Sequence, residues 1–216
     1  MCSEQMEMMD TPWTGCVPPD GTGRTAPVAR RRCFRRRPDA VSWRPMPVSV
    51  ASSRLIYDCL KEAGVRIMSA LPETWLVHLI RMAEEDPEMT LVRLAKEEEG
   101  VGISAGAHLA GVRSAMLMQN HGFLASVNGI VSCAQLYRIP LLMLISHRGE
   151  FGERDPWQTE GGGVTTHVLD ALRIPHARIE APEQVRGRVT KAQTLAYSAS
   201  RPVALLLCRD LMWEEA

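Results

Sequence analysis

The sequence predicts an α/β protein: a single three-layer domain in which about six mainly parallel strands are flanked by helices. From residue 52 onward, short apolar runs alternate with segments of helical periodicity. The runs are apolar throughout rather than at every second position, which is typical of strands buried on both faces of a parallel sheet. A chain of 216 residues is long enough for one such domain, and two full domains would be cramped.

The first half of this domain alternates helices and strands. Residues 52–64 predict a helix with a serine cap and with Gly64 as its stop. The apolar run 65–71 predicts a buried strand, and residues 72–85 predict a helix with Pro72 near its first turn. The half is completed by a strand, a helix and a strand: residues 89–95, 97–111 and 114–120.

The second half continues the alternation. Residues 122–138 predict a helix and residues 140–146 a strand. The stretch 147–163, HRGEFGERDPWQTEGGG, is too polar and glycine-rich for either and predicts a long loop. The remaining elements are a helix, a strand, a helix opened by proline and a final strand: residues 165–173, 176–180, 182–200 and 202–208.

The segment before this domain has a different composition. Residues 1–45 are rich in Pro, Gly, Arg and Thr and lack helical or strand periodicity, so we predict a disordered basic segment, with the folded domain at residues 46–216. The run ARRRCFRRRP could also bind nucleic acid or target an organelle, and Met46 could be the true start.

Charge and cysteine content exclude several classes of protein. Lys plus Arg and Asp plus Glu are equal at 25 each, so no net charge attracts the chain to nucleic acid or to an anionic membrane. The six cysteines contain no C-x-x-C pair, which argues against a zinc site or a disulfide framework. No apolar run approaches the roughly 18 residues of a membrane span. We therefore expect a cytoplasmic protein with no nucleic-acid partner, no membrane partner and no metal ligands of its own.

Polar side chains gather where the predicted strands end. In an open parallel sheet the functional crevice lies at the carboxyl ends of the strands. There the sequence places an acid, a histidine, two amides and an arginine, which would suit an anionic carbonyl substrate. The alternatives are structural: acids at a helix N-terminus, a turn cap, a surface ion pair and amides that satisfy loop backbone groups. The segments concerned are 71–73, 97–99, 119–122 and 146–149.

The glycines of GVGISAG do not indicate a dinucleotide site. That motif needs its glycines in the turn between a strand and its helix, and here acids occupy the turn. Gly102 and Gly106 instead predict a bare helix face packed closely against the sheet or a partner.

The run EEEGVGISAGAHLAGVRSAMLMQNHGFLASVNG, read together with GVRIMSALPETWL before it and IPLLMLISHRGEFGE after it, resembles a known family. It looks like the pyrimidine-binding domain of thiamine diphosphate enzymes, especially the alpha subunit of sulfopyruvate decarboxylase and its phosphonopyruvate decarboxylase relatives. The likeness covers approximately residues 52–208. It implies a pyrimidine-type thiamine diphosphate-binding fold.

The resemblance assigns the first of three adjacent glutamates to catalysis. Counting back from Gly106 to the strand-to-helix turn gives Glu97, which would hydrogen-bond the cofactor's aminopyrimidine at N1′ and favour the imino tautomer. Glu98 and Glu99 then fall on the first helical turn, where they are favourable end charges.

Other positions follow from the same resemblance. Pro72 matches the family's proline turn, and Gln119 and Gly122 match a turn that approaches the cofactor. His121 replaces the serine common in the family, and it either donates a proton in catalysis or orients a neighbour. The substrate-binding candidates are Arg148, for a second anion of the substrate, and Gln158, in the loop that would cover the site.

The family also needs a domain that binds magnesium and diphosphate through a Gly-Asp-Gly turn, and this sequence contains no such turn. The resemblance therefore implies a beta subunit that holds Mg²⁺ and the diphosphate. The expected function is decarboxylation of the small 2-oxo acid sulfopyruvate to sulfoacetaldehyde, active only with that partner. Phosphonopyruvate is the alternative substrate, and a non-catalytic regulatory module that retained the fold is the alternative from another class.

Overall fold

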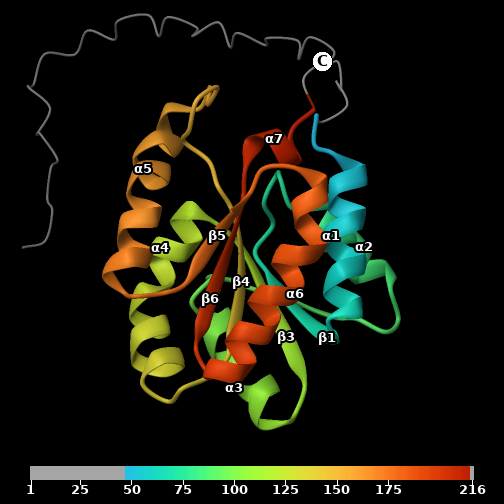
Figure 1. The fold of residues 1–216 in the computed structure, drawn as a ribbon, viewed down its shortest axis with the longest axis vertical. Coiled ribbons are helices and arrows are strands. Elements are labelled where there is room, and N and C mark those ends of the chain that lie inside the picture. The colour runs from blue at the N-terminus through green and yellow to red at the C-terminus, as the bar shows by residue number, and fades with distance from the viewer. Residues whose placement is uncertain (1–46, 215–216) are drawn as a thin grey trace, which may run out of the picture. The chain divides into compact units, whose positions relative to one another are not determined.

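The computed structural model describes residues 47–214, so the prediction of a disordered segment at residues 1–45 lies outside the described residues. Six strands form one sheet in the order β2-β1-β3-β4-β6-β5, and every pair is parallel (Figure 1). The predicted α/β fold with a six-stranded parallel sheet is thus confirmed. The strands are β1 Val65–Ala70, β2 Thr90–Arg93, β3 Arg113–Gln119, β4 Leu141–Ser146, β5 His176–Ile179 and β6 Pro202–Leu207.

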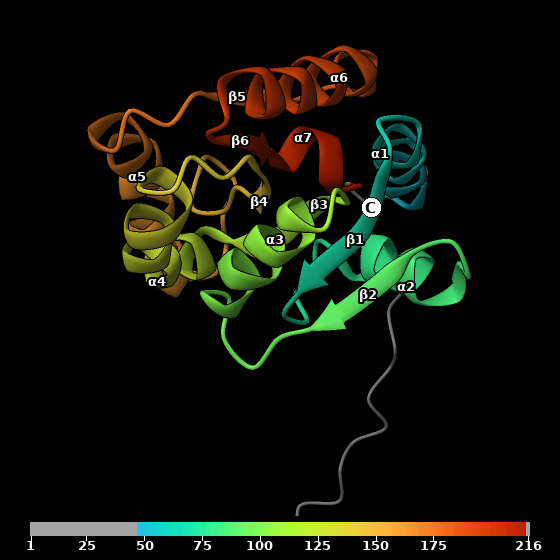
Figure 2. The ribbon, with the colours of Figure 1, turned by 90° about the horizontal axis from the view of Figure 1, so that it is seen from below.

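Helices cover both faces of the sheet and complete the three layers (Figure 2). One face packs against α1 Val50–Glu62, α2 Val77–Glu85, α6 Pro182–Ala199 and the short α7 Arg209–Met212. The other packs against α3 Glu99–Leu109, α4 Asn120–Gly129, its π-helical continuation η1 Ile130–Gln135, and α5 Pro156–Ala171.

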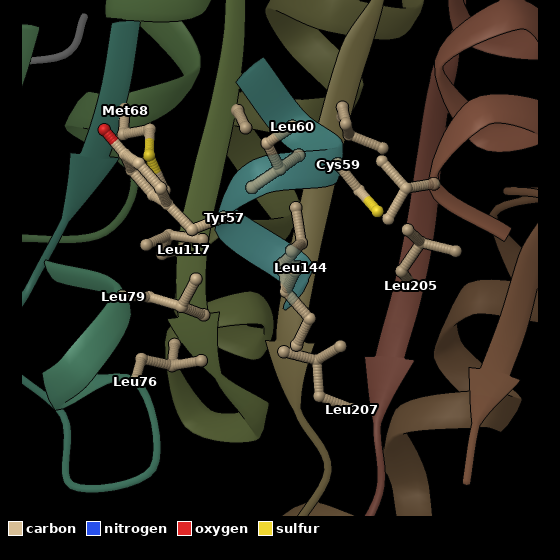
Figure 3. Packing of buried hydrophobic residues seen from close by; sticks show 14 of the residues in the cluster. Tyr57, Cys59, Leu60, Met68, Leu76, Leu79, Leu117, Leu144, Leu205 and Leu207 are labelled. Carbon is tan, nitrogen blue, oxygen red and sulfur yellow. The ribbon is translucent and has the colours of Figure 1, made fainter. Parts of the chain in front are cut away.

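Successive side chains of the strands enter two separate cores. In β4, Leu142 and Leu144 join the cluster beneath α1, whereas Met143 and Ile145 join the cluster on the opposite face. Figure 3 shows Leu144 packed below the first helix of the chain. Both faces are buried, which is why the strand sequences are apolar throughout, and each fully buried Leu contributes about 1.5–3 kcal/mol.

The starts of the first two predicted helices differ from the structure. The first helix begins before residue 52, because the Ser49 hydroxyl caps it by accepting from the Ser52 amide at 3.2 Å. The second begins at Val77 rather than at Pro72. Residues 72–76 form a turn instead, and within it the Glu73 carboxylate accepts from the Leu76 amide at 3.0 Å.

The predicted loop at residues 147–163 is wrong in its second half, because α5 begins at Pro156. Two of the glycines that argued against a helix, Gly161 and Gly162, lie in close packing. A Cβ on Gly162 would overlap the Arg148 carbonyl, and one on Gly161 would lie 2.8 Å from the His121 ring. Glycine is therefore accommodated in α5. At these positions the helix approaches the end of β4 and the start of α4 too closely for side chains.

The small-residue face of α3 does not pack on the sheet. Gly102 and Gly106 are exposed, and a Cβ on either would meet nothing within 4 Å among the described residues. Of the two predictions for this face, packing against the sheet is wrong, and packing against a partner stays a prediction.

Candidate active site

A cavity of about 450 Å³ opens at the carboxyl ends of β1, β3 and β4. This is the edge at which parallel sheets place their functional crevices. The cavity brings together four of the residues selected from the sequence, which come from the turn after β1, the end of β3, the segment after β4, and α5. The lining residues are Pro72, Glu73, Thr74, Val77, Gln119, Arg148 and Gln158.

The three adjacent glutamates before α3 have different surroundings. Glu99 accepts from the amides of Ala95 and Lys96 at 2.9 and 3.4 Å, so it closes the turn into the helix. Glu98 accepts from the Asn128 side chain at 3.4 Å. Within residues 47–214, the carboxylate of Glu97 alone among the three has neither a hydrogen bond nor an ion pair.

Glu97 lies directly against the first turn of α4. An ideal Cβ on Gly122 would be 2.5 Å from Glu97 Oε1 and 2.6 Å from its Cγ. Only glycine leaves room for the carboxylate at this position, so the structure joins these two predicted residues in one contact. Neither of them lines the cavity. Gly122 lies in the first turn of α4, which directly follows the cavity residue Gln119.

His121 lies on the same turn but faces a different neighbour. Its side chain is exposed, and its ring packs over Gly161 of α5. Like Glu97, it lies outside the lining of the cavity.

Two glutamines bridge β3 and α5 at the cavity wall. Gln158 Nε2 donates to Gln119 Oε1 at 3.2 Å. Gln158 is 7% exposed, and its Oε1 is buried without a hydrogen-bond partner in the described part of the chain. A buried amide oxygen without a partner is costly, so this atom is suited to accept a hydrogen bond from a bound molecule.

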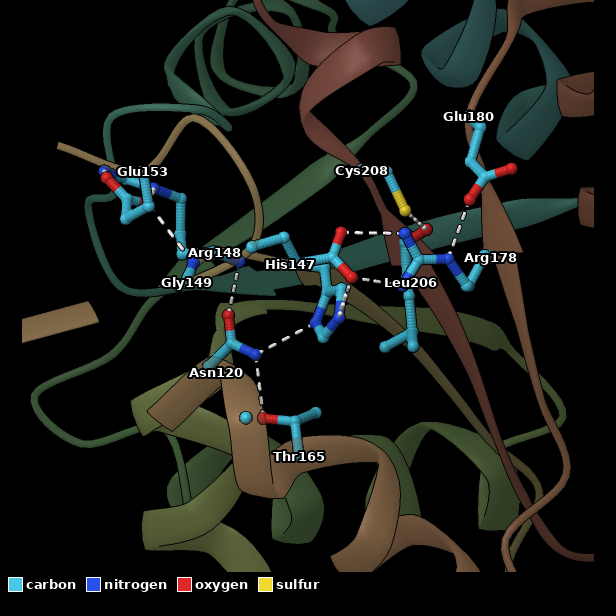
Figure 4. Close-up of polar contacts among 12 residues, drawn as sticks. Asn120, His147, Arg148, Gly149, Glu153, Thr165, Arg178, Glu180, Leu206 and Cys208 are labelled. Carbon is cyan, nitrogen blue, oxygen red and sulfur yellow. Dashed lines mark hydrogen bonds and ion pairs between the residues drawn. The ribbon is translucent and has the colours of Figure 1, made fainter. Parts of the chain in front are cut away.

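Asn120 connects the turn to the sheet and is a residue that the sequence analysis did not select (Figure 4). It is fully buried, and its Nδ2 approaches Thr165 Oγ1 at 2.7 Å and His147 Nδ1 at 3.1 Å. Its Oδ1 accepts from the Arg148 amide at 2.7 Å. One side chain thus positions α4, α5 and the segment after β4, and its only signal in the sequence was its place in the MQN turn.

His147 extends this network toward the surface. Burial lowers its pKa, although Glu150 nearby opposes that shift. With Asn120 donating to Nδ1, the proton of the neutral ring lies on Nε2, 3.2 Å from Glu150 Oε1. Arg178 holds that carboxylate in turn, with Nη2 at 2.7 Å from Oε2.

Arg148 is the buried cation of the cavity, 8% exposed and with its guanidinium carbon 4.8 Å from the Trp75 ring centroid. Its Nε and Nη2 donate to the two oxygens of Glu153 at 2.7 and 2.8 Å, and Nη2 also reaches Asp155 at 2.9 Å. The paired hydrogen bonds expected for a substrate anion are therefore made with Glu153. Nη1 makes no hydrogen bond among the described residues, and contact between Arg148 and substrate stays a prediction.

Glu73 is the second residue that sequence reasoning left unselected, although it directly follows Pro72 at a strand end. It lines the cavity together with Arg148, and these two are the ionisable groups among the described lining residues. Burial raises its pKa. The amides of Trp75 and Leu76 and the Arg148 guanidinium counteract that shift only in part, and the nearby Ser146 hydroxyl makes no hydrogen bond within residues 47–214.

None of the helices within residues 47–214 is long and apolar enough to cross a membrane. In the same part of the chain, no group of three or more His, Cys, Asp or Glu residues is arranged to hold a metal ion.

Comparison with known proteins connects this geometry to a family. The family model described as thiamine pyrophosphate enzyme, N-terminal TPP binding domain, matches residues 51–178. The sulfopyruvate decarboxylase subunit alpha of Methanocaldococcus jannaschii is 38% identical over 162 residues, which cover 75% of this chain and 95% of the relative. A sulfopyruvate decarboxylase of Methanosarcina acetivorans is 30% identical over 160 residues, which cover 74% of this chain but 40% of that longer relative.

The fold recurs in a solved structure. The 2-oxoglutarate:ferredoxin oxidoreductase from Magnetococcus marinus matches with a TM-score of 0.56 and 18% identity, over 78% of this chain and 31% of that one, and this likeness concerns the fold alone. The family model spans more than half of the chain, and a curated relative is matched over nearly its whole length. This chain therefore belongs to the thiamine pyrophosphate enzymes, in the family of the sulfopyruvate decarboxylase alpha subunits.

Proposed function

We propose that this chain is the alpha subunit of a thiamine diphosphate-dependent decarboxylase that converts sulfopyruvate to sulfoacetaldehyde and CO₂. The observation that carries the proposal is Glu97, whose carboxylate has no partner within residues 47–214 and lies against Gly122. Sulfopyruvate is the substrate named for the relative matched over 95% of its length.

The residues present fit the cofactor. A carboxylate with no protein partner can hydrogen-bond a ring nitrogen, and a glycine beside it lets a flat ring approach without a side chain in between. Glu97 would exchange a proton with N1′ of the aminopyrimidine, and Pro72, Gln119 and Gly122 would shape the space around the ring. When bound, thiamine diphosphate supplies the carbon nucleophile and accepts the electrons released with CO₂.

A beta subunit would supply the remaining half of the site, including Mg²⁺ and the diphosphate contacts. This chain corresponds to 40% of a longer sulfopyruvate decarboxylase, which supports a division of one enzyme between two chains. The sequence also contains no Gly-Asp-Gly turn. We expect the isolated chain to be inactive.

The cavity provides groups for a small 2-oxo acid with a second anion. Arg148 Nη1 could donate to a sulfonate oxygen, and Gln158 Oε1, unpartnered within residues 47–214, could accept a hydrogen bond from a donor group of the bound molecule. Phosphonopyruvate carries the same carboxylate and ketone with a different second anion, so it is the alternative substrate.

Cytoplasm stays the predicted location, and Cys59, Cys133 and Cys208 are free thiols, as a reducing compartment requires.

The experiment is decarboxylation of sulfopyruvate and phosphonopyruvate by this chain co-expressed with its partner, with thiamine diphosphate and Mg²⁺. Glu97→Gln should lower kcat/KM by at least about 10²-fold, because an amide cannot exchange the proton. Glu98→Gln is the matched control, since the Glu98 carboxylate accepts from the Asn128 side chain at the surface, and this variant should retain wild-type activity.

The turnover measured with each substrate distinguishes the decarboxylase from the regulatory module. Turnover of one substrate, lost in Glu97→Gln only, supports the function and identifies the second anion. A verified complex with bound cofactor that turns over neither substrate would favour the regulatory module, for which His121 in place of the family's serine is the argument.

A further inference from the structure

Loss of CO₂ from a 2-oxo acid consumes a proton, and the aldehyde cannot form until that proton arrives. The bond between the carbonyl carbon and the carboxylate breaks, CO₂ leaves, and the bonding electrons remain on the former carbonyl carbon. A new C–H bond must then form there. This inference rests on the proposed function and asks which group of the chain donates the proton.

We propose that Glu73 delivers this proton to the substrate carbon. Glu73 is the one acid among the described residues that line the cavity. Its Oε2 is held by the Leu76 amide at 3.0 Å, while Oε1 makes no hydrogen bond within residues 47–214. The carboxyl group is thus fixed by one oxygen and has the other available at the cavity wall.

The electrostatics of the cavity favour the protonated acid. The pKa of Glu73 is raised, chiefly by burial, and the Arg148 guanidinium opposes the shift without cancelling it. Arg148 is itself paired with two carboxylates, Glu153 and Asp155. Its positive charge is therefore balanced, and an ionised Glu73 would add repulsion against a substrate that carries two anions.

The other polar groups of the cavity do not release protons near neutral pH. Arg148 stays charged in proteins, and Thr74, Gln119 and Gln158 are not acids in this range. The His121 side chain is exposed and packs over Gly161, outside the cavity lining. Glu73 would donate, become a carboxylate, and recover its proton from water before the next turnover.

A structural role for Glu73 must be separated from this one, because its Oε2 accepts from the Leu76 amide in the turn before α2. Glu73→Gln makes the separation. The amide oxygen can still accept from Leu76, but the side chain can no longer transfer a proton. Glu85→Gln is the matched control, since Glu85 ends the same helix in an exposed ion pair with Arg81.

The first readout is made on the co-expressed complex with sulfopyruvate. CO₂ leaves before the proton is delivered, so Glu73→Gln should release CO₂ promptly in a single turnover while aldehyde release slows by about 10²-fold or more. Wild-type kcat, which includes the steps after CO₂ leaves, should be constant at low pH and fall as the pH rises through the raised pKa of Glu73. In the variant this fall should be absent.

The second readout needs neither cofactor nor partner. A raised pKa of an acid stabilises the fold below the ordinary pKa of glutamate, and this contribution is lost as the pH rises through the folded pKa. In urea unfolding of the isolated full chain, wild type should therefore lose stability relative to Glu73→Gln as the pH increases. Parallel curves for the two proteins would contradict the ionisation that the inference assumes.

The outcomes separate the two proposals. Wild-type decarboxylation with normal aldehyde release in Glu73→Gln overturns the role of Glu73 and leaves the function intact. Equal slowing of CO₂ and aldehyde, with an unchanged pH profile, also overturns it and assigns Glu73 to binding. Delayed aldehyde release in His121→Gln but not in Glu73→Gln would make His121 the donor. A wild-type complex that releases no CO₂ overturns the function and this inference together.

Discussion

Gly122→Ala tests the contact between α4 and the glutamate assigned to the cofactor. The added methyl group would lie 2.5, 2.6 and 2.7 Å from Oε1, Cγ and Cδ of Glu97. Ordinary contacts between such atoms begin near roughly 3.4 Å, so the carboxylate must withdraw by about 1 Å. Glu97 is partly exposed and has no polar partner within residues 47–214, so it can move without disturbing the core.

The expected result is a large loss of activity with little loss of stability. A misplacement of about 1 Å in a group that acts on the reacting centre costs roughly 10²-fold in rate. Crowding of the new methyl group destabilises the fold, but alanine is favoured over glycine within a helix by about 0.5–1 kcal/mol. We therefore expect kcat/KM to fall about 10²-fold while the free energy of unfolding changes by less than about 1 kcal/mol.

The assay pairs steady-state decarboxylation by the complex with urea unfolding of the chain. Gly187→Ala in α6 is the control, because a Cβ there meets nothing within 4 Å among the described residues and activity should be unchanged. The reasoning is refuted if Gly122→Ala retains more than half of wild-type kcat/KM.

Three further changes test the packing around the cavity. Asn120→Ala leaves buried partners without hydrogen bonds and should cost about 2–4 kcal/mol in urea unfolding, and a cost below 1 kcal/mol would contradict its connecting role. Arg148 lowers the pKa of Glu153 to about 2, so their pair stabilises the fold above pH 4.5 and this stabilisation is lost as the pH falls toward 2. Glu153→Gln should therefore cost about 3 kcal/mol at pH 7 and flatten the acid limb of the stability profile. Gly162→Ala should destabilise the chain by about 1–3 kcal/mol in thermal unfolding, whereas Gly163→Ala, with open space beside it, should be neutral or stabilising; equal effects would argue against the close approach of α5.

Much of the fold could be predicted because its signals are local. Apolar runs between helical patterns identified six strands, and their uniform apolarity followed from burial in two cores. The errors occurred where a distant contact overrides local preference. Glycine disfavours helices by itself, yet Gly161 and Gly162 belong to α5 because the helix packs directly on the end of β4 and on the His121 ring.

The candidate site divides in the same way. Residues carried by a recognisable series of motifs, such as Glu97, Gln119 and Gly122, were selected because their order along the chain is informative. Asn120 and Glu73 were not selected, since their roles depend on partners far along the chain: Thr165 and His147 for the one, the cavity and Arg148 for the other. No sequence window contains those partners together.

By itself, then, the sequence determined the class of fold and the family, and it selected the glutamate proposed to face the cofactor, because periodicity and motif order are properties of neighbouring residues. Tertiary structure alone decided which of the polar side chains share a cavity, which of them are already paired, and which acid lines that cavity. Those properties depend on distances and on solvent exclusion, and both arise only when segments remote in the chain pack against one another.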